Sequence, residues 1–347
     1  MLANSSPRPS IDSRRLAGPR AGFTLVELVI VVAIIGILAA IITPAVMRSF
    51  GAARDAKVKV EITQLASAVT AFKATFGVEP PSRIVLFEGA ADGADSGGND
   101  WDDYTTYSVG GEAKRSRAWI KRLWTRFDFS AARDLNGDGD STDVYQLNGA
   151  ECLAFFLGGP CIQVGGRLAP QGFSKNPQNP FAPPLTTGES REGPFFEFDS
   201  ARLTNVTGGY FPEYLDSLPD QTVPYVYFSS YDGQGYDAAD GISINSVTLN
   251  PYYSVTEDTN LNGTLDTGED RITSPASTIS VIEYFNPRSF QIISAGVDNM
   301  HGTGGFFDPA RPQVSLKYGR PATSAANSPQ AEYDNITNFN AGRLFNR

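Results

Sequence analysis

An unbroken apolar segment near the N-terminus constrains the fold of this chain more than any other feature. From Leu28 to Ile42 it has no charged or strongly polar side chain. Extended to 23–47, it supplies the ~20 residues that a helix needs to cross a bilayer at about 1.5 Å per residue. We therefore predict a membrane-spanning helix. Its one carboxylate, Glu27, lies near the start, where a charge at bilayer depth costs about 2.5 to 3.5 kcal/mol, so Glu27 needs a partner.

The residues ahead of this segment, 1–22, carry four arginines and one aspartate. This charge bias predicts that the N-terminus stays in the cytoplasm and that the chain beyond Met47 lies outside the membrane. A secretory signal has its small-residue cleavage site after its apolar core, whereas here Ala21 and Gly22 come before it. The leader therefore differs from an ordinary signal peptide.

The sequence Gly-Phe-Thr-Leu-Val-Glu at residues 22–27, followed by the apolar run, resembles the prepilin leader of type IV pilins and type II secretion pseudopilins. The resemblance implies cleavage after Gly22 by a prepilin peptidase, N-methylation of Phe23, and retention of the apolar helix. Pro44 lies where many family members have a helix-bending proline, so it is an expected assembly residue. The implied partners are other copies or related pilin and pseudopilin subunits, an inner-membrane assembly platform and membrane lipid.

Glu27 is the second predicted assembly residue. Cleavage would free the amine of Phe23, which titrates near pH 8 in water and is a cation at neutral pH. The Glu27 carboxylate does not easily reach the amine of its own helix, but it can meet that of a neighbouring subunit displaced along a filament axis. Such a pair offsets part of the burial cost and fixes one axial register. The alternative is a carboxylate that reaches the cytoplasmic interface.

The charge of the chain argues against general nucleic-acid binding. The 347 residues carry a net charge of −10, and removal of residues 1–22 takes away a net +3, which leaves −13. An acidic head favours solubility or cation binding.

The two cysteines, Cys152 and Cys161, form an even number in what should be an oxidising compartment. A small disulfide loop between them is therefore predicted. Two reduced, buried cysteines are the alternative.

A second helical pattern follows Pro44. Its apolar positions recur at a period near 3.6 with polar residues between them, and they are Val58, Ile62, Leu65, Val69, Phe72 and Phe76. The pattern stops at Gly77, and the prolines at 80–81 forbid its continuation. We predict one rod from Thr24 to Phe76, whose second half lays its apolar stripe on a head domain.

The rest of the chain predicts an α+β fold, in which the long helix packs on a head with an antiparallel sheet and long calcium-binding loops. A helix is expected within 114–127. Alternating apolar runs separated by turn residues predict strands at 225–228, 242–249, 278–285 and 289–294. The expected segments are a leader (1–22), an assembly helix (23–47), an amphipathic helix (48–78), a loop-rich insertion (79–194) and a sheet-bearing head (195–347).

The loop at 258–269 satisfies the calcium-loop pattern D-x-[DN]-x-[DN]-G-x5-E in full. Calcium takes six to eight oxygen ligands, which such a loop supplies from alternate positions and a closing bidentate glutamate. The expected ligands are Asp258, Asn260, Asn262, Thr264, Asp266 and Glu269. The flanking residues do not predict paired helices, so this is an EF-hand-like loop without the EF-hand, and a solvated acidic turn is the alternative.

A second loop, at 134–143, fits the first half of the same pattern. Its twelfth position is Tyr145, so the bidentate ligand is missing, and Asp143 is the expected substitute. The candidate ligands are Asp134, Asn136, Asp138, Asp140 and Asp143.

A third candidate lies near the C-terminus, where the strand-like run 290–294 leads to Asp298, and Asp334 follows later. This arrangement resembles the end of major pseudopilins, in which such a strand leads into a calcium loop closed by an acidic pair. The resemblance implies ligand roles for Asp298 and Asp334. Here the second acidic position is Asn335, and an Asp-stabilised turn is the alternative.

Enzymatic functions have little support in the sequence. With His301 as the only histidine, a histidine-rich zinc site is excluded, and neither a nucleophile elbow nor a phosphate-binding glycine loop occurs. We predict a non-enzymatic, calcium-stabilised subunit of a pseudopilus-like filament in the inner membrane, with its head in the periplasm or on an extracellular filament. The alternatives are a minor pilin with an adhesive or surface-binding head, and a single-pass anchored periplasmic calcium-binding protein.

Overall fold

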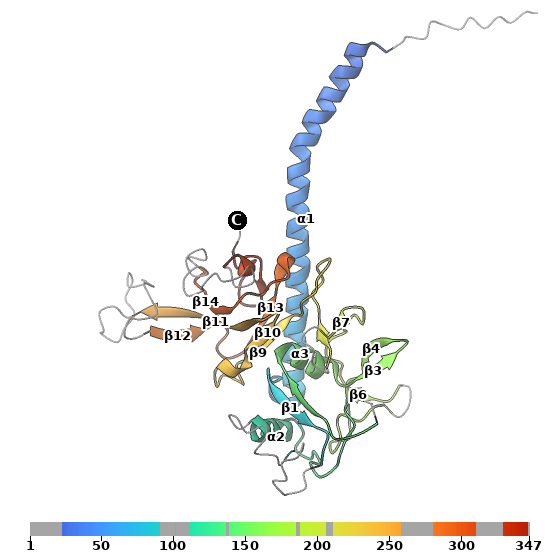
Figure 1. The fold of residues 1–347 in the computed structure, drawn as a ribbon, viewed down its shortest axis with the longest axis vertical. Coiled ribbons are helices and arrows are strands. Elements are labelled where there is room, and N and C mark those ends of the chain that lie inside the picture. Colours follow the sequence, from blue (N-terminus) through green and yellow to red (C-terminus); the bar gives the residue numbers. More distant parts are fainter. Residues whose placement is uncertain are drawn as a thin grey trace, which may run out of the picture. The chain divides into compact units, whose positions relative to one another are not determined.

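The structure is a computed structural model that describes residues 23–90, 101, 112–136, 139–184, 188–205, 211–257, 280–309 and 329–345. The chain divides into two compact units, an N-terminal unit (Met1–Ala52) and a head unit (Ala53–Arg347). Helix α1, Leu25–Phe76, is a single helix that contributes residues to both (Figure 1). A long apolar helix followed by a sheet-rich head confirms the predicted α+β class.

In the described part of the N-terminal unit, α1 exposes its side chains as far as Phe50. Every residue from Phe23 to Phe50 is exposed, and α1 is the one helix of the described chain that is long and apolar enough to cross a membrane. Pro44 lies inside the helix without ending it. Because proline cannot donate to the carbonyl four residues earlier, it removes one helical hydrogen bond at this point.

In the head unit, α1 buries the stripe that its sequence predicts. Val58, Ile62, Leu65, Val69 and Phe72 are each 0% exposed. The helix ends at Gly77, whose positive φ of 79° suits a glycine at a helix C-terminus, and its N–H donates to the Lys73 carbonyl at 2.8 Å.

The region predicted as a loop-rich insertion contains regular elements. Strand β1 (Ile84–Phe87) pairs antiparallel with β2 (Val144–Leu147), and helix α2 spans Glu112–Leu123, close to the predicted 114–127. Two further antiparallel pairs lie in this region, β3 (Cys161–Val164) with β4 (Arg167–Pro170) and β5 (Phe173–Ser174) with β6 (Arg191–Glu192). Beyond it, β7 (Leu203–Thr204) pairs antiparallel with β8 (Glu213–Tyr214).

Helix α3 spans Gly149–Gly158 in this region, and all its residues are buried. Asn148 caps its N-terminus in a reciprocal capping box with Glu151. A Cβ added at Gly149 would lie 1.9 Å from the carbonyl oxygen of Tyr227, so only glycine lets α3 approach strand β9 this closely.

The predicted antiparallel sheet is two sheets. One has the order β15–β13–β9 and is antiparallel throughout, from Ile336–Thr337, Phe290–Ser294 and Val226–Ser229. The other has the order β10–β11–β12, from Ile242–Ile244, Val247–Glu257 and Ser280–Tyr284, and β14 (Gly304–Phe306) pairs parallel with β11.

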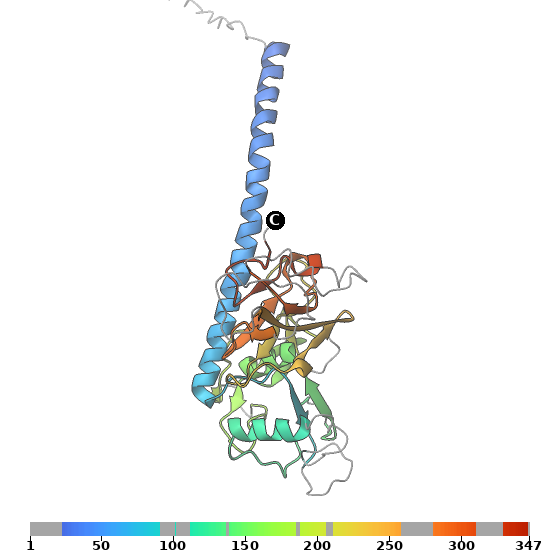
Figure 2. The ribbon, with the colours of Figure 1, turned by 90° about the vertical axis from the view of Figure 1, so that its left-hand side faces the viewer.

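The run 242–249 was expected to be one strand and is a hairpin instead. Asn245 and Ser246 have positive φ values of 51° and 66°, which two-residue hairpin turns require. Three single-turn helices complete the described elements: η1 (Ala238–Asp240), η2 (Gly296–Asp298) and η4 (Pro329–Glu332). Within the head unit, α2 and the C-terminal segment lie at opposite ends (Figures 1 and 2).

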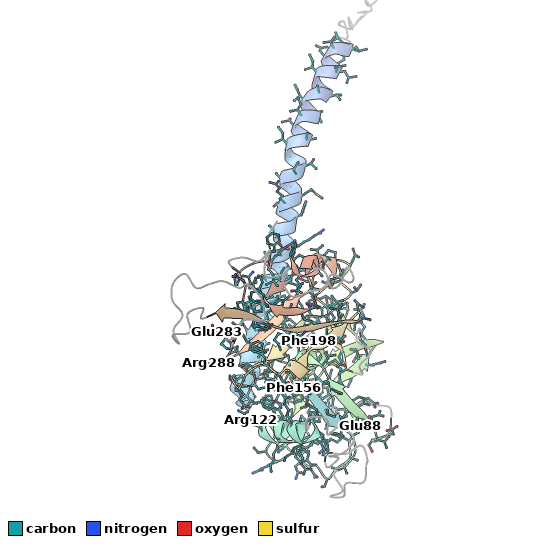
Figure 3. The ribbon with its side chains drawn as sticks, turned by 60° about the vertical axis from the view of Figure 1, so that its left-hand side comes forward. Glu88, Arg122, Phe156, Phe198, Glu283 and Arg288 are labelled. Atoms are coloured by element: carbon teal, nitrogen blue, oxygen red, sulfur yellow. The ribbon has the colours of Figure 1, made fainter. Side chains whose placement is uncertain are left out.

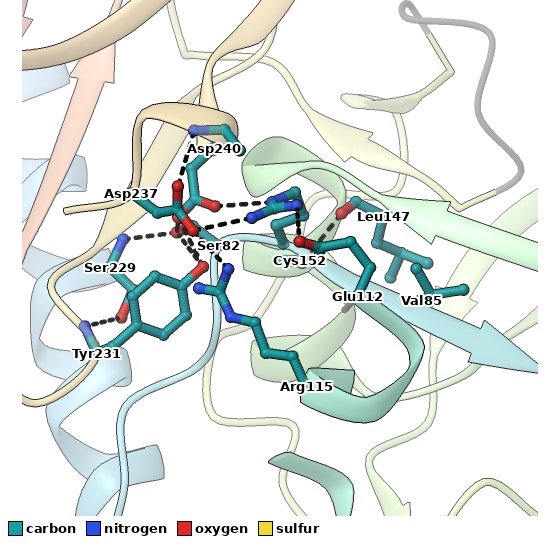
Figure 4. A network of polar contacts seen from close by, with 12 residues as sticks. Ser82, Val85, Glu112, Arg115, Leu147, Cys152, Ser229, Tyr231, Asp237 and Asp240 are labelled. Carbon is teal, nitrogen blue, oxygen red and sulfur yellow. Dashed lines mark hydrogen bonds and ion pairs between the residues drawn. The ribbon is translucent and has the colours of Figure 1, made fainter. Parts of the chain in front are cut away.

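An ionic network around the largely buried Arg83 joins the insertion to η1, which directly precedes β10 (Figure 4). Arg83 follows the end of α1 and forms ion pairs with Glu112 of α2, with Asp237 and with Asp240. The Tyr231 hydroxyl also donates to Asp240, at 2.6 Å. These hydrogen bonds outweigh burial and raise the pKa of Arg83. The cation is therefore satisfied, as a buried charge must be.

Candidate assembly and cation sites

The described chain begins at Phe23, so Gly22 lies outside it, and Phe23 itself is 78% exposed. Glu27 has a partner within its own chain. Its Oε2 accepts hydrogen bonds from the Thr24 backbone N–H at 2.9 Å and from the Thr24 hydroxyl at 2.8 Å, and the Glu27 N–H donates back to Thr24 Oγ1 at 3.2 Å. This is a capping box. The sequence signal for this cap is the pattern Thr-x-x-Glu at residues 24–27.

The full calcium-loop pattern, with Asp258, Asn260, Asn262, Thr264, Asp266 and Glu269, lies outside the described residues. Its surroundings are described: β11 and β12 pair antiparallel as far as Glu257 and Ser280. The strands on either side of residues 258–279 are therefore antiparallel partners. The flanks of this loop are strands, as the absence of a helical pattern predicted.

The loop at 134–143 lies next to Glu88, a residue that the sequence did not indicate as a ligand. Carboxylate oxygens of Glu88, Asp140 and Asp143 lie within 4.8 Å of one another, so this acidic cluster can hold a metal ion. Glu88 directly follows β1 and is labelled in Figure 3. Asp138 lies outside the described residues.

Glu88 is fully buried, with 0% exposure. Its Oε1 accepts from the Leu135 N–H at 2.6 Å, and its Oε2 accepts from the Asp143 N–H at 3.3 Å. Burial nevertheless raises the pKa of Glu88, and the nearby Asp143 charge adds to this rise. A divalent cation would relieve both effects.

The remaining residues of this loop are held by internal hydrogen bonds. Asp134 accepts from the Gly139 N–H at 3.0 Å, the Asn136 amide donates to Asp143 at 3.0 Å, and Tyr145 donates to Asp143 at 2.7 Å. Tyr145, the twelfth position of the pattern, lies in β2 and offers no carboxylate. Glu88 supplies the carboxylate that the loop itself lacks. The only signal for it in the sequence was a glutamate directly after a short apolar run.

The structure brings Asp298 and Asp334 together. Asp334 Oδ2 accepts from the N–H groups of Val297 at 2.5 Å and Asp298 at 3.1 Å. Asp334 Oδ1 is buried and has no hydrogen-bond partner. Gly296, with φ of 71°, makes the approach possible, since a Cβ there would lie 2.4 Å from the Asp334 carbonyl oxygen.

Two carboxylates in this position disfavour each other's ionisation. Desolvation, together with the charge of Asp334, raises the pKa of Asp298 to about 7. Burial also raises the pKa of Asp334, against the hydrogen bonds that it accepts. The Asp334 oxygen without a hydrogen-bond partner lies near the carboxylate of Asp298, and such a pair of oxygen ligands suits a hard divalent cation. Asn335 is buried, and its amide donates to Tyr252 and to the His301 carbonyl.

The predicted disulfide is not formed in the structure, where Cys152 and Cys161 are free thiols. Cys152 is buried in α3 and its Sγ lies 3.9 Å from the Leu147 carbonyl oxygen, whereas the Cys161 Sγ lies 3.9 Å from the Gly159 carbonyl oxygen. The thiols are thus engaged with different backbone groups. Burial raises the pKa of Cys161 to about 12, so it is a thiol at neutral pH.

The single histidine of the sequence, His301, is buried. One ring nitrogen of His301 lies 2.9 Å from the Pro224 carbonyl oxygen, and Nδ1 has no partner. Burial lowers the pKa of His301 to about 4, so the ring is neutral at neutral pH.

Residues 19–43 match the family model of the prokaryotic N-terminal methylation motif. Neither curated proteins nor solved structures give a match to this chain.

Proposed function

Because this motif is the prepilin-like leader of type IV pilins and pseudopilins, we propose that the chain is a structural subunit of a type II secretion pseudopilus-like filament. The uncut protein waits in the inner membrane, and prepilin peptidase cleaves it after Gly22. The mature chain then enters a growing helical filament through its N-terminal helix. The head stands in the periplasm or on an extracellular filament.

The observation that carries this proposal is the exposure of α1 from Phe23 to Phe50. A soluble domain rarely leaves a contiguous apolar surface of this size open. Lipid can cover it before assembly, and the helices of neighbouring subunits can cover it afterwards. In the head unit, by contrast, the apolar stripe of α1 is buried in the core of that unit.

Calcium is the second part of the proposal. The residues that would hold it are Glu88, Asp140 and Asp143 at one site, Asp298 and Asp334 at another, and the loop 258–269 at a third. Calcium supplies a divalent charge that neutralises neighbouring carboxylates and takes only oxygen ligands. The buried and unpartnered Oδ1 of Asp334 and the clustered oxygens around Glu88 support this assignment.

The N-terminus of the membrane-extracted protein tests the first part. Intact mass and N-terminal peptide mapping should give a chain that begins at methylated Phe23 in cells with an active prepilin peptidase, and at Met1 in cells without it. A chain that keeps residues 1–22 in both strains would contradict the proposal and favour an anchored periplasmic protein.

The role of Glu27 needs a variant that separates charge from capping. Glu27→Gln keeps a capping-box side chain and removes the charge, whereas Thr24→Ala removes the cap and keeps the charge. If Glu27 pairs with the amine of a neighbouring subunit, Glu27→Gln should abolish incorporation into filaments while Thr24→Ala reduces it only in part. Normal incorporation of Glu27→Gln would leave Glu27 with the capping role alone.

A further inference from the structure

The densest run of positive charge in the mature chain belongs to α2 and the turn after it. Residues 114–126 hold six cations and no carboxylate, and without these six charges the net charge of −13 would be −19. The exposed residues of α2 recur at helical spacing and share one face; they are Lys114, Ala118, Lys121 and Arg122. Arg126, in the turn that follows, is exposed as well.

Some of these cations are neutralised by the chain itself, and others are not. Arg115 pairs with Asp237 at 2.7 Å and Arg122 pairs with Asp232 at 2.9 Å, so ion pairs hold α2 in place on the head. Three cations of the run form no ion pair or hydrogen bond with a described residue, and we call them the basic face: Lys114, Lys121 and Arg126. The basic face is therefore presented to solvent by a helix whose position is fixed.

The head-unit part of α1 measures the distance between the two ends of the head. Near its start, Asp55 pairs with Arg343 of the C-terminal segment at 2.7 Å. Near its end, Lys73 pairs at 3.1 Å with Asp232, the residue that also pairs with Arg122 of α2. At 1.5 Å per residue, Asp55 and Lys73 lie about 27 Å apart along the helix. The basic face and the C-terminal segment are thus at opposite ends of the head (Figure 2).

The end with the C-terminal segment presents exposed carboxylates. Asp298 lies in η2, and its N–H donates to Asp334 of the C-terminal segment at 3.1 Å. The neighbouring Asn299 accepts from the Thr222 N–H at 2.7 Å, which brings the loop of Asp220 to the same end. Asp220 and Asp298 are exposed and form no ion pair with a described residue. We call these two residues the acidic face.

We propose that the basic face docks on the acidic face of a second copy of this chain, in a head-to-tail contact between neighbouring heads. The inference rests on the proposed filament and names a contact between its heads. Subunits with a net charge of −13 repel one another unless opposite charges meet where they touch. Because the two faces are different surfaces at opposite ends, each contact leaves a free face at either end for the next copy, as an open helical filament requires.

A lipid surface is the less favoured occupant of the basic face. A helix that lies in a membrane interface needs an exposed apolar side, whereas the apolar side of α2 is buried in its own head through Ala113, Ile120 and Leu123. What α2 offers to a partner is charge alone.

The experiment is zero-length carbodiimide cross-linking, which joins a lysine amine to a carboxylate that touches it. It is done on membranes of cells that produce the full chain, in chelator, so that bound metal does not cover the carboxylates. Peptide mapping should find Lys114 or Lys121 joined to Asp220 or Asp298, in a ladder of covalent multimers. Because the two faces lie at opposite ends of one head, such a junction forms only between two copies.

A charge reversal that keeps both lysines tests the cause of the contact. Arg126→Glu should lower the yield of these junctions by about threefold, because exposed ion pairs each contribute modestly. Arg167→Glu is the charge-matched control, since Arg167 of β4 is exposed and likewise forms no ion pair with a described residue. It should keep the parent yield. A rise in NaCl from 0.1 to 1 M shortens the Debye length from about 10 to about 3 Å and should lower the yield of the parent chain as well.

Junctions between the two faces that weaken in Arg126→Glu and persist in Arg167→Glu support the proposal. A parent chain without these junctions overturns it, whether the two lysines stay unmodified or join other proteins. Equal losses in the two variants overturn it as well, because net charge and not the basic face would then govern the contact. The proposed function is judged separately, since a chain that begins at methylated Phe23 is a processed subunit even when no such junction forms.

Discussion

The two halves of α1 differ in whether their apolar surface is covered by the rest of the chain. From Leu28 to Ile42 the helix has no charged or strongly polar side chain and every residue is exposed, whereas from Val58 to Phe72 it is amphipathic and its apolar stripe is buried. The helix is continuous across this change. The first half needs lipid or other subunits to cover it, and the second half is covered by the rest of its own chain.

This difference separates two kinds of sequence constraint. In the exposed half, a substitution between Leu28 and Ile42 that stays apolar preserves the surface, because no charged or strongly polar side chain interrupts this run. In the buried half, each position faces a specific neighbour, since Phe72 contacts the rings of Phe76, Phe156 and Phe195. Substitutions should therefore act on assembly in the first half and on head stability in the second.

The largest expected effect comes from the buried half. Phe72→Ala should destabilise the head by about 3 to 5 kcal/mol, because it removes a fully buried ring and leaves a cavity. Denaturant unfolding of the full chain in detergent, followed by fluorescence, measures this, since all three tryptophans belong to the head unit. Ile37→Ala, at a position 63% exposed, is the matched control and should leave the transition unchanged. Equal effects of the two would remove the distinction between the halves.

The next effect concerns the charged group on the buried half, Glu61. It forms an ion pair with Arg202 and accepts from the Tyr225 hydroxyl at 2.7 Å. Burial would raise the pKa of Glu61, but hydrogen bonds from Arg202 and Tyr225 outweigh it, and the pKa is lowered from its ordinary 4.5. Glu61→Gln leaves Arg202 without its counter-charge and should cost about 2 kcal/mol at neutral pH.

The pH dependence of this contribution has a definite sign. Because the folded-state pKa lies below the unfolded one, the stabilisation is present above pH 4.5 and is lost as pH falls through the folded pKa. Melting curves of the parent and Glu61→Gln should therefore converge at acid pH. A gap that stays constant down to pH 3 would mean that the lost packing, and not the charge, causes the difference.

His301 should make the head sensitive to mild acid. Its folded pKa of about 4 lies below the ordinary 6.5, so stability is unaffected above pH 6.5 and is lost as pH falls from 6.5 toward 4, by at most about 3 kcal/mol. His301→Gln should remove this loss. Asp298 and Asp334 titrate in both proteins, so the difference between the two melting profiles isolates His301. Parallel profiles from pH 7 to 4 would contradict it.

Local periodicity made most of the fold predictable. Apolar spacing predicts the helix 25–76, its buried stripe, and the strands 226–229 and 290–294. The observed bounds of these elements lie within a few residues of the predicted ones. The hairpin turn at Asn245 and Ser246 was missed because two polar residues with positive φ interrupt an alternation that continues on both sides. The division into two sheets depends on which strands meet, and spacing along the chain carries no such information.

The sites were predictable only where their ligands are neighbours in sequence. The pattern at 134–143 led to Asp140 and Asp143, but Glu88 joins them from the end of β1, the strand that pairs with β2. In the same way, an even number of cysteines did not place Cys152 and Cys161 in bonding contact. Resemblance to known pseudopilins supplied Asp298 and Asp334, and the fold brings the two into contact, with the Asp298 N–H donating to the Asp334 carboxylate.

Removal of divalent cations should give the smallest effect, and it should be confined to the head. A ligand that binds only the folded state adds RT ln(1 + [L]/Kd), which is about 1.4 kcal/mol per site at tenfold saturation. For a unit of this size, each site corresponds to a melting shift of about 2 °C. Chelation should therefore lower the melting temperature of the head by a few degrees and leave the helical signal of the exposed half unchanged. In the part of the chain that the structure describes, that half contains no cluster of ligands.

Glu88→Gln should reduce this melting shift by the contribution of one site. Glu283→Gln, at an exposed glutamate outside the cluster, serves as its control. A chelator-insensitive melt would show that the acidic loops hold themselves through the hydrogen bonds that Glu88 and Asp334 accept, and calcium would then have no part in completing the head.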